Sequence, residues 1–137
     1  MVEFLNDENR AEFVKLFKKA LKKNEFKDIQ DLEGACILLY KEANSYVGFL
    51  EGFIELNRLT NTNVAHILAI YVLPNYRNEG KAYSMIEKFE EWLKDKNCTD
   101  VVASMSIKNK KSLDFFDKVS FQNVGTCVFM KKSINKN

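Results

Sequence analysis

LAIYVLPNYRNEGKAYSMIEKF, residues 68–89, decides the fold of this 137-residue chain. An almost continuously apolar run, rich in β-branched and aromatic residues, ends at Pro74, the only proline of the sequence. From Glu79 onward, apolar residues recur every three or four positions with charged residues between them, which is the pattern of an amphipathic helix. The stretch therefore predicts a strand at 64–73, buried on both faces, that turns through Gly80 into the strongest helix of the chain.

Other elements are predicted on both sides of this junction. Residues 8–23 place apolar side chains at helical spacing with lysines between them, which indicates an amphipathic helix. Residues 35–43 and 45–56 are two β-prone runs separated by a short polar turn, as in a hairpin. Three further elements are expected downstream: a short buried strand at 100–107, a helix at 108–119 and a last strand at 123–132.

This order of elements predicts one mixed α/β domain that covers residues 1–137. The segment 64–107 reads as a strand, a helix and a second strand. Such a crossover brings its two strands together in parallel, whereas the hairpin before it is antiparallel.

Composition argues against several classes of function. A net charge of +2 is too small for the concentrated basic surface of a nucleic-acid-binding protein. No apolar run approaches the roughly 18 residues of a membrane span, and no basic-then-apolar leader opens the chain. Three widely spaced cysteines without a C-x-x-C pair predict neither a disulfide framework nor a metal site. We therefore expect a cytoplasmic protein without a nucleic-acid or membrane partner.

The junction between strand and helix has the composition of an anion site. The first backbone N–H groups of a helix lack partners, and the helix dipole adds positive potential there. Gly80 allows a phosphate to approach the backbone closely, Ala82 is small, and Arg77 contributes charge. The pattern R-x-x-G-x-A thus fits pyrophosphate binding, although a turn of this composition can also simply connect two elements.

Further motifs accompany this pattern at specific spacings. V-x-P ends the strand, R-x-x-G-x-A opens the helix, and N-x-x-S-x-x-x-F-x-x-x-S-F follows the next strand. Jointly they resemble the acetyl-CoA-binding core of the GNAT superfamily of N-acetyltransferases, over about half of the chain. The later half, together with Glu51 in GFLEG, looks most like the aminoglycoside 6′-N-acetyltransferases. The resemblance implies a mostly antiparallel mixed sheet with a central, splayed parallel pair, flanked by helices.

The resemblance also implies acetyl-CoA as cofactor and a role for each matched position. The backbone at 70–72 would pair with the pantetheine arm as an added strand, and the amide of Val72 would polarise the thioester carbonyl. Amides at 77–82 would cradle the pyrophosphate, and Asn109 would meet the cofactor near its amide arm. The implied cofactor residues are Ile70, Tyr71, Val72, Arg77, Asn78, Glu79, Gly80, Lys81, Ala82, Asn109, Ser112 and Phe116.

The proton-transfer positions of the family are altered in this chain. Leu68 stands where many members have an acidic general base, and Met105 stands where the aminoglycoside enzymes have aspartate. Phe116 occupies the position of a tyrosine that protonates the leaving thiolate, and Ser120 that of a glycine. A substitute base is therefore expected, because an ammonium group must lose a proton before it attacks.

Three side chains are candidates for this base. His66, the only histidine, lies two residues before Leu68 and titrates in a range suited to proton transfer; alternatively it is a core histidine with one hydrogen bond. Glu51 and Glu55 share one face of the preceding strand, where they would hold a cationic amine or accept its proton through water. Alternatively, they line a solvated or dimer-facing strand edge.

The function expected from these features is acetyl transfer to a primary amine of a small polar molecule such as an aminoglycoside or a polyamine. One alternative is a domain that binds CoA or a partner without catalysis, since its proton-transfer positions are changed. Another is a protein or peptide N-acetyltransferase. A homodimer is also expected, because many proteins of the family associate through late strands or helices.

Overall fold

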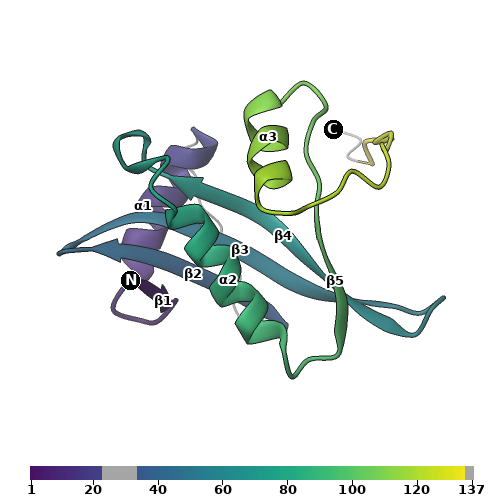
Figure 1. The fold of residues 1–137 in the computed structure, drawn as a ribbon, viewed down its shortest axis with the longest axis horizontal. Helices are drawn as coiled ribbons and strands as arrows, with labels where there is room; N and C mark the ends of the chain where they lie inside the picture. Colours follow the sequence, from purple (N-terminus) through teal and green to yellow (C-terminus); the bar gives the residue numbers. More distant parts are fainter. Residues whose placement is uncertain (23–33, 135–137) are drawn as a thin grey trace. The chain divides into compact units, whose positions relative to one another are not determined.

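The computed structural model describes residues 1–22 and 34–134 (Figure 1). They form two compact units, one ending at Ser104 and one beginning at Met105. The elements are β1 (Val2–Phe4), α1 (Arg10–Leu21), β2 (Ala35–Glu42), β3 (Ser45–Asn57), β4 (Thr62–Val72), the 3₁₀ turn η1 (Pro74–Tyr76), α2 (Lys81–Leu93), β5 (Cys98–Ala103) and α3 (Lys110–Lys118).

The first unit is built on a five-stranded mixed sheet with the order β1-β2-β3-β4-β5. Neighbouring strands are antiparallel except for β4 and β5, which are parallel and joined through α2. The predicted mixed α/β class and parallel crossover are confirmed. The short strand β1 was not expected, because three residues carry too little alternation to indicate a strand.

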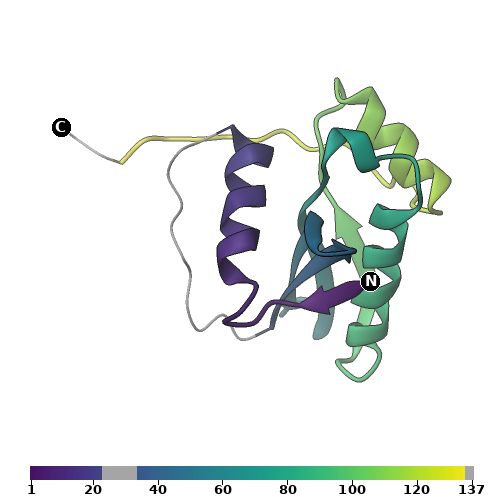
Figure 2. The ribbon, with the colours of Figure 1, turned by 90° about the vertical axis from the view of Figure 1, so that its left-hand side faces the viewer.

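Helices cover both faces of this sheet, α1 on one and α2 on the other (Figure 2). Phe13 of α1 packs edge-on against Phe49 of β3, with ring centroids 5.3 Å apart. On the opposite face Phe89 of α2 is fully buried. A Cβ atom at Gly52 of β3 would lie 2.5 Å from the Phe89 ring, so only glycine lets the helix approach the strand this closely.

Two irregularities interrupt β4 in its second half. Gly52 is opposite Ile67 and Glu51 is opposite Ala69, so Leu68 is the extra residue of a β-bulge. The parallel ladder to β5 covers only Asn63–Ile67 of β4, because β5 ends at Ala103, opposite Ile67. The prediction that this strand is buried on both faces is wrong, because the bulge and the missing neighbour leave Leu68 62% exposed.

The second unit contains the predicted helix α3, but the predicted last strand at 123–132 is wrong. Residues 121–134 form neither helix nor strand. A β-prone sequence needs a neighbouring strand to satisfy its backbone groups, and residues 121–134 are paired with none. As a result β5 is an edge strand of the described sheet and is only partly buried, contrary to the prediction.

Candidate active site

Beyond Ile67, one edge of β4 pairs with β3, and no described strand pairs with its other edge, which is called the open edge below. The N–H group of Leu73 donates to the carbonyl of Val47 on β3, at 2.8 Å. Because N–H groups alternate along a strand, those of Val72 and Ile70 point the other way, toward the open edge. An extended ligand can pair with such an edge as an added strand.

Arg77 supports this edge from the loop that follows. Its Nε atom donates to the carbonyl oxygen of Val72 at 2.7 Å, and its guanidinium lies over the Tyr71 ring, 5.5 Å from the centroid. Arg77, which the sequence predicted to attract an anion, therefore also holds the end of β4 in place. Its place beside the loop keeps a positive charge close to the start of α2.

The loop between β4 and α2 has the backbone of an anion cradle. Asn78 and Gly80 adopt left-handed conformations, with φ values of 63° and 79°. Gly80 is the N-cap of α2, and no side chain of the described residues caps this helix end. A Cβ atom at Gly80 would meet nothing within 4 Å, so glycine is required there for its conformation, and the backbone stays accessible. These residues fit the phosphates of the cofactor implied by the sequence.

The side chain of Lys81 is directed away from this loop's exposed backbone, so only its amide is available to an anion there. Its side chain is turned inward and is 6% exposed, with Nζ 2.7 Å from Oε1 of Glu79 and 3.1 Å from Oε1 of Glu42. Sequence reasoning assigned Lys81 to the cradle but missed this side chain. Its partner Glu42 lies 39 positions earlier, and no periodicity in the sequence connects the two residues.

The candidate bases lie together on the sheet face that carries α1. Glu51, Phe53 and Glu55 alternate along β3 on the same face as Phe49, and His66 of β4 is directly opposite Phe53. The His66 and Phe53 rings stack with centroids 4.9 Å apart and planes 10° from parallel. The Nε2 atom of His66 lies 3.4 Å from Oε1 of Glu55.

Two polar groups of this face, on His66 and Glu51, are shielded from solvent to different degrees. His66 Nε2 is shielded from solvent, and its contact with Glu55 does not meet the geometry of a hydrogen bond, so within the described residues this nitrogen has no hydrogen-bond partner. Burial raises the pKa of the Glu51 carboxyl above its ordinary value. Leu68, at the family's position for a general base, is the bulge residue and has no group that can accept a proton.

In the second unit, the N-x-x-S motif begins a helix. Asn109 is the N-cap of α3, and its Oδ1 atom accepts a hydrogen bond from the backbone N–H of Ser112 at 3.2 Å. This contact satisfies one of the unpaired donors in the first turn. The spacing of these two residues is therefore explained by helix capping alone, and their contact with a cofactor stays a prediction.

The F-x-x-x-S-F motif ends the same helix. The N–H of Phe121 donates to the carbonyl of Phe116 at 2.9 Å, and the N–H of Ser120 donates to that of Asp117 at 3.2 Å. With Ser120 left-handed at φ 74°, this is a Schellman motif, closed by edge-to-face packing of the Phe116 and Phe121 rings. Phe116 packs in this motif, and its side chain has no proton to transfer. Its catalytic role and its contact with the cofactor stay predictions.

Comparison with known proteins identifies the family. The profile of the acetyltransferase (GNAT) family matches residues 2–121. The chain belongs to the GNAT acetyltransferase family. Members of this family take their acetyl group from acetyl-CoA.

Individual relatives share this assignment. The GNAT chain is 27% identical over 109 residues to an aminoglycoside N(6′)-acetyltransferase type 1 of Acinetobacter genomosp. 13, a match that covers 77% of this chain and 75% of that protein. Its fold is similar to that of AAC(6′)-Iy bound to a bisubstrate analogue, with a TM-score of 0.89, 17% identity and 97% of both chains covered. A ribosomal-protein-alanine N-acetyltransferase of Brucella melitensis biovar Abortus 2308 gives a TM-score of 0.81, 15% identity and coverage of 96% and 99%. The GNAT fold alone therefore does not identify the acceptor.

Proposed function

We propose that this GNAT protein is an acetyl-CoA-dependent N-acetyltransferase whose acceptor is a primary amine of an aminoglycoside. The observation that carries the proposal is the open edge of β4 at Leu68–Val72. This edge continues through η1 and the loop 77–80 to the start of α2, which no side chain of the described residues caps. On its other side β4 pairs with the strand that bears Glu51 and Glu55. The naming of curated relatives as aminoglycoside acetyltransferases supports the acceptor class.

The chain offers separate groups for separate parts of the cofactor. Acetyl-CoA, when bound, supplies the acetyl group as a reactive thioester. The amide of Ile70 at the open edge suits the pantetheine arm, and the amides of the loop 77–82 suit the pyrophosphate. The amide of Val72 suits the carbonyl oxygen of the thioester, since it is directed to the same edge.

The face formed by Glu51, Glu55 and His66 suits a cationic acceptor. Aminoglycosides carry several ammonium groups, which two carboxylates on one sheet face attract. His66 is our proposed general base, because its Nε2 atom is buried without a hydrogen-bond partner in the described part of the chain, and Phe53 fixes its ring. A thiolate is a tolerable leaving group, with a reference pKa of about 8.5, so Phe116 need not supply an acid.

Acetyl transfer and CoA binding are measured on the same purified protein. CoA binding is followed by calorimetry, and thiol release from acetyl-CoA is followed with a panel of amines. The panel contains two aminoglycosides that differ only in an amine or a hydroxyl at the 6′ carbon, together with spermidine and a short peptide. We expect CoA binding, and thiol release only with the 6′-amine.

Each competing function has its own outcome in this panel. CoA binding without turnover on any amine would indicate a binding domain without catalysis. Turnover on spermidine or on the peptide would assign a polyamine or a protein acceptor. Absence of CoA binding would overturn the proposed cofactor and the activity together.

The role of His66 is tested by His66→Gln, which keeps a polar side chain but removes proton transfer. We expect kcat to fall about 100-fold or more, because general base catalysis contributes this much, and the pH dependence of kcat/KM near neutrality to flatten. The Kd for CoA should not change. An unchanged kcat and pH profile would show that another group is the base.

We further propose that the protein forms a homodimer through its C-terminal segment, residues 121–134. Within residues 121–134, five apolar side chains are more than four-fifths exposed: Val124, Val128, Phe129, Met130 and Ile134. A single β-prone segment that exposes this much apolar surface is suited to pair with another chain. Its proposed partner is the outer edge of β5 in a second copy, since β1, the other sheet edge of the described residues, has only three residues.

A further inference from the structure

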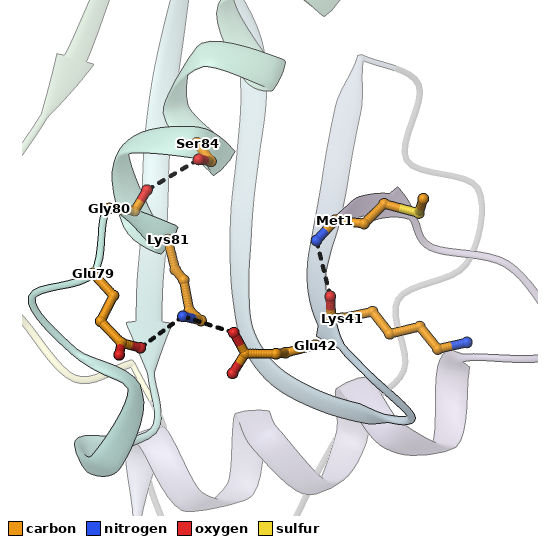
Figure 3. A network of polar contacts seen from close by, with 7 residues as sticks. All are labelled: Met1, Lys41, Glu42, Glu79, Gly80, Lys81 and Ser84. Atoms are coloured by element: carbon orange, nitrogen blue, oxygen red, sulfur yellow. Dashed lines mark hydrogen bonds and ion pairs between the residues drawn. The ribbon is translucent and has the colours of Figure 1, made fainter.

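Lys81 is the first residue of α2, yet its ammonium group is buried between four side chains. It forms ion pairs with Glu79 at 2.7 Å and with Glu42 at 3.1 Å (Figure 3). It also lies over the ring of Tyr40, 5.5 Å from the centroid, and over that of Tyr76, 5.8 Å away. Two carboxylates and two aromatic faces thus surround one positive charge.

These partners connect two distant parts of the first unit. Tyr40 and Glu42 are at the end of β2, whereas Tyr76 and Glu79 lie on either side of the exposed residues Arg77 and Asn78. One ammonium group therefore holds both ends of this short loop and ties them to β2. A loop held in this way keeps its amides in place before a ligand arrives.

The charge of Lys81 is already balanced by its own partners. The hydrogen bond that Lys81 donates to Glu79 raises the pKa of the ammonium above its ordinary value, so the group remains charged at neutral pH. Glu42 and Glu79 stay about half exposed, with side-chain exposures of 45% and 54%, and keep part of their hydration. A lysine neutralised by two carboxylates is poorly suited to bind phosphate directly. Lys81 can therefore assist phosphate binding only by holding the loop in its conformation.

We propose that Lys81 is a positioning residue that holds the phosphate-binding loop, residues 77–80, against β2. The inference rests on the proposed use of acetyl-CoA. In addition, the loop requires a buried cation that does not contact the cofactor, because this cation holds the loop amides in place for the phosphates. Loss of this cation should weaken recognition of the phosphates and leave recognition of the pantetheine arm unchanged.

The experiment compares Lys81→Met with Lys88→Met in the full-length protein. Lys88 is a matched control, because it belongs to the same helix and pairs with Glu91 at 3.7 Å, with its side chain 35% exposed. Calorimetry gives the Kd for CoA, and NMR titration gives the Kd for pantetheine, which lacks the pyrophosphate. We expect Lys81→Met to raise the Kd for CoA at least about tenfold and to leave the Kd for pantetheine unchanged. Lys88→Met should change neither Kd.

Two further variants keep the test decisive if Lys81→Met does not fold. Glu42→Gln weakens the link to β2 but leaves the ammonium paired with Glu79, so it should give a smaller loss of CoA affinity with the same preference for the phosphates. Lys81→Arg keeps the charge and should restore part of the affinity lost in Lys81→Met.

The outcomes separate this inference from the proposed function. If the unaltered protein does not bind CoA, the proposed function fails and the inference fails with it. If the unaltered protein binds CoA and the Lys81 and Glu42 variants bind it equally well, the inference alone is overturned. Equal losses of affinity for CoA and for pantetheine would also overturn it, because they would show a general structural defect.

Discussion

Glu51 is a single residue whose proposed role in acceptor binding opposes stability. It lies on the sheet face proposed to bind the cationic acceptor, and burial raises the pKa of its carboxyl above the ordinary value of 4.5. The folded protein therefore holds this proton more tightly than the unfolded chain. The resulting stabilisation is complete below the unfolded pKa and is lost as the pH rises through the folded pKa.

We expect Glu51→Gln to be more stable than the unaltered protein at pH 7, because the variant buries no charge at this position. The difference should shrink as the pH falls through the folded pKa, which lies above 4.5, and should be lost below about 4.5. Urea unfolding at a series of pH values measures the free energy of unfolding, and Glu91→Gln on α2 corrects for the change in net charge. A difference that stays the same at every pH would contradict the assigned burial effect.

At the scale of an element, α3 shows how a motif used to recognise a family can be explained by helix geometry. Asn109 caps the start of the helix, and Phe116, Ser120 and Phe121 form the Schellman motif at its end. The position of Ser120 requires a left-handed backbone, which glycine adopts without steric cost. The glycine at this position in the family pattern thus has a conformational explanation.

Ser120→Gly should consequently stabilise the protein. Relief of the left-handed strain, worth about 1–2 kcal/mol, exceeds the added entropy of glycine in the unfolded chain, about 0.5–1 kcal/mol. We expect a net gain of about 0.5–1 kcal/mol and a rise in Tm of a few degrees, measured by thermal unfolding. Ser120→Ala retains the Cβ atom and is the matched control. A similar gain in Ser120→Ala would show that the hydroxyl, and not the backbone strain, is responsible.

At the scale of the whole molecule, the exposed C-terminal segment is the basis of the proposed homodimer. Phe129→Lys tests the proposal, and Leu59→Lys is its control. Both side chains are almost fully exposed, at 89% and 97%, but only Phe129 belongs to the segment. We expect light scattering to give twice the chain mass of 15.9 kDa for the unaltered protein and for Leu59→Lys. Phe129→Lys should be monomeric, because a charged side chain opposes strand pairing at an apolar interface. A monomeric unaltered protein, or a dimer that persists in Phe129→Lys, would contradict the proposal.

Elements with local signals could be predicted from the sequence. The periodicity from Glu79 onward predicted α2, and Pro74 and Gly80 marked the turn that separates α2 from β4. The hairpin of β2 and β3 and the parallel crossover also followed from the order of apolar runs. Each helix, strand and turn is indicated by residues only a few positions apart, and the strand pairing was inferred from the order of these elements along the chain.

Contacts between distant side chains could not be predicted in this way. The bulge at Leu68, the stacking of His66 on Phe53 and the ion pair of Lys81 with Glu42 each require strands or helices to lie side by side. The predicted last strand failed for the same reason, because whether a β-prone segment forms a strand depends on a neighbour with free hydrogen-bonding groups. Local propensity shows which secondary structure a segment favours, and contacts with distant segments determine whether that structure forms.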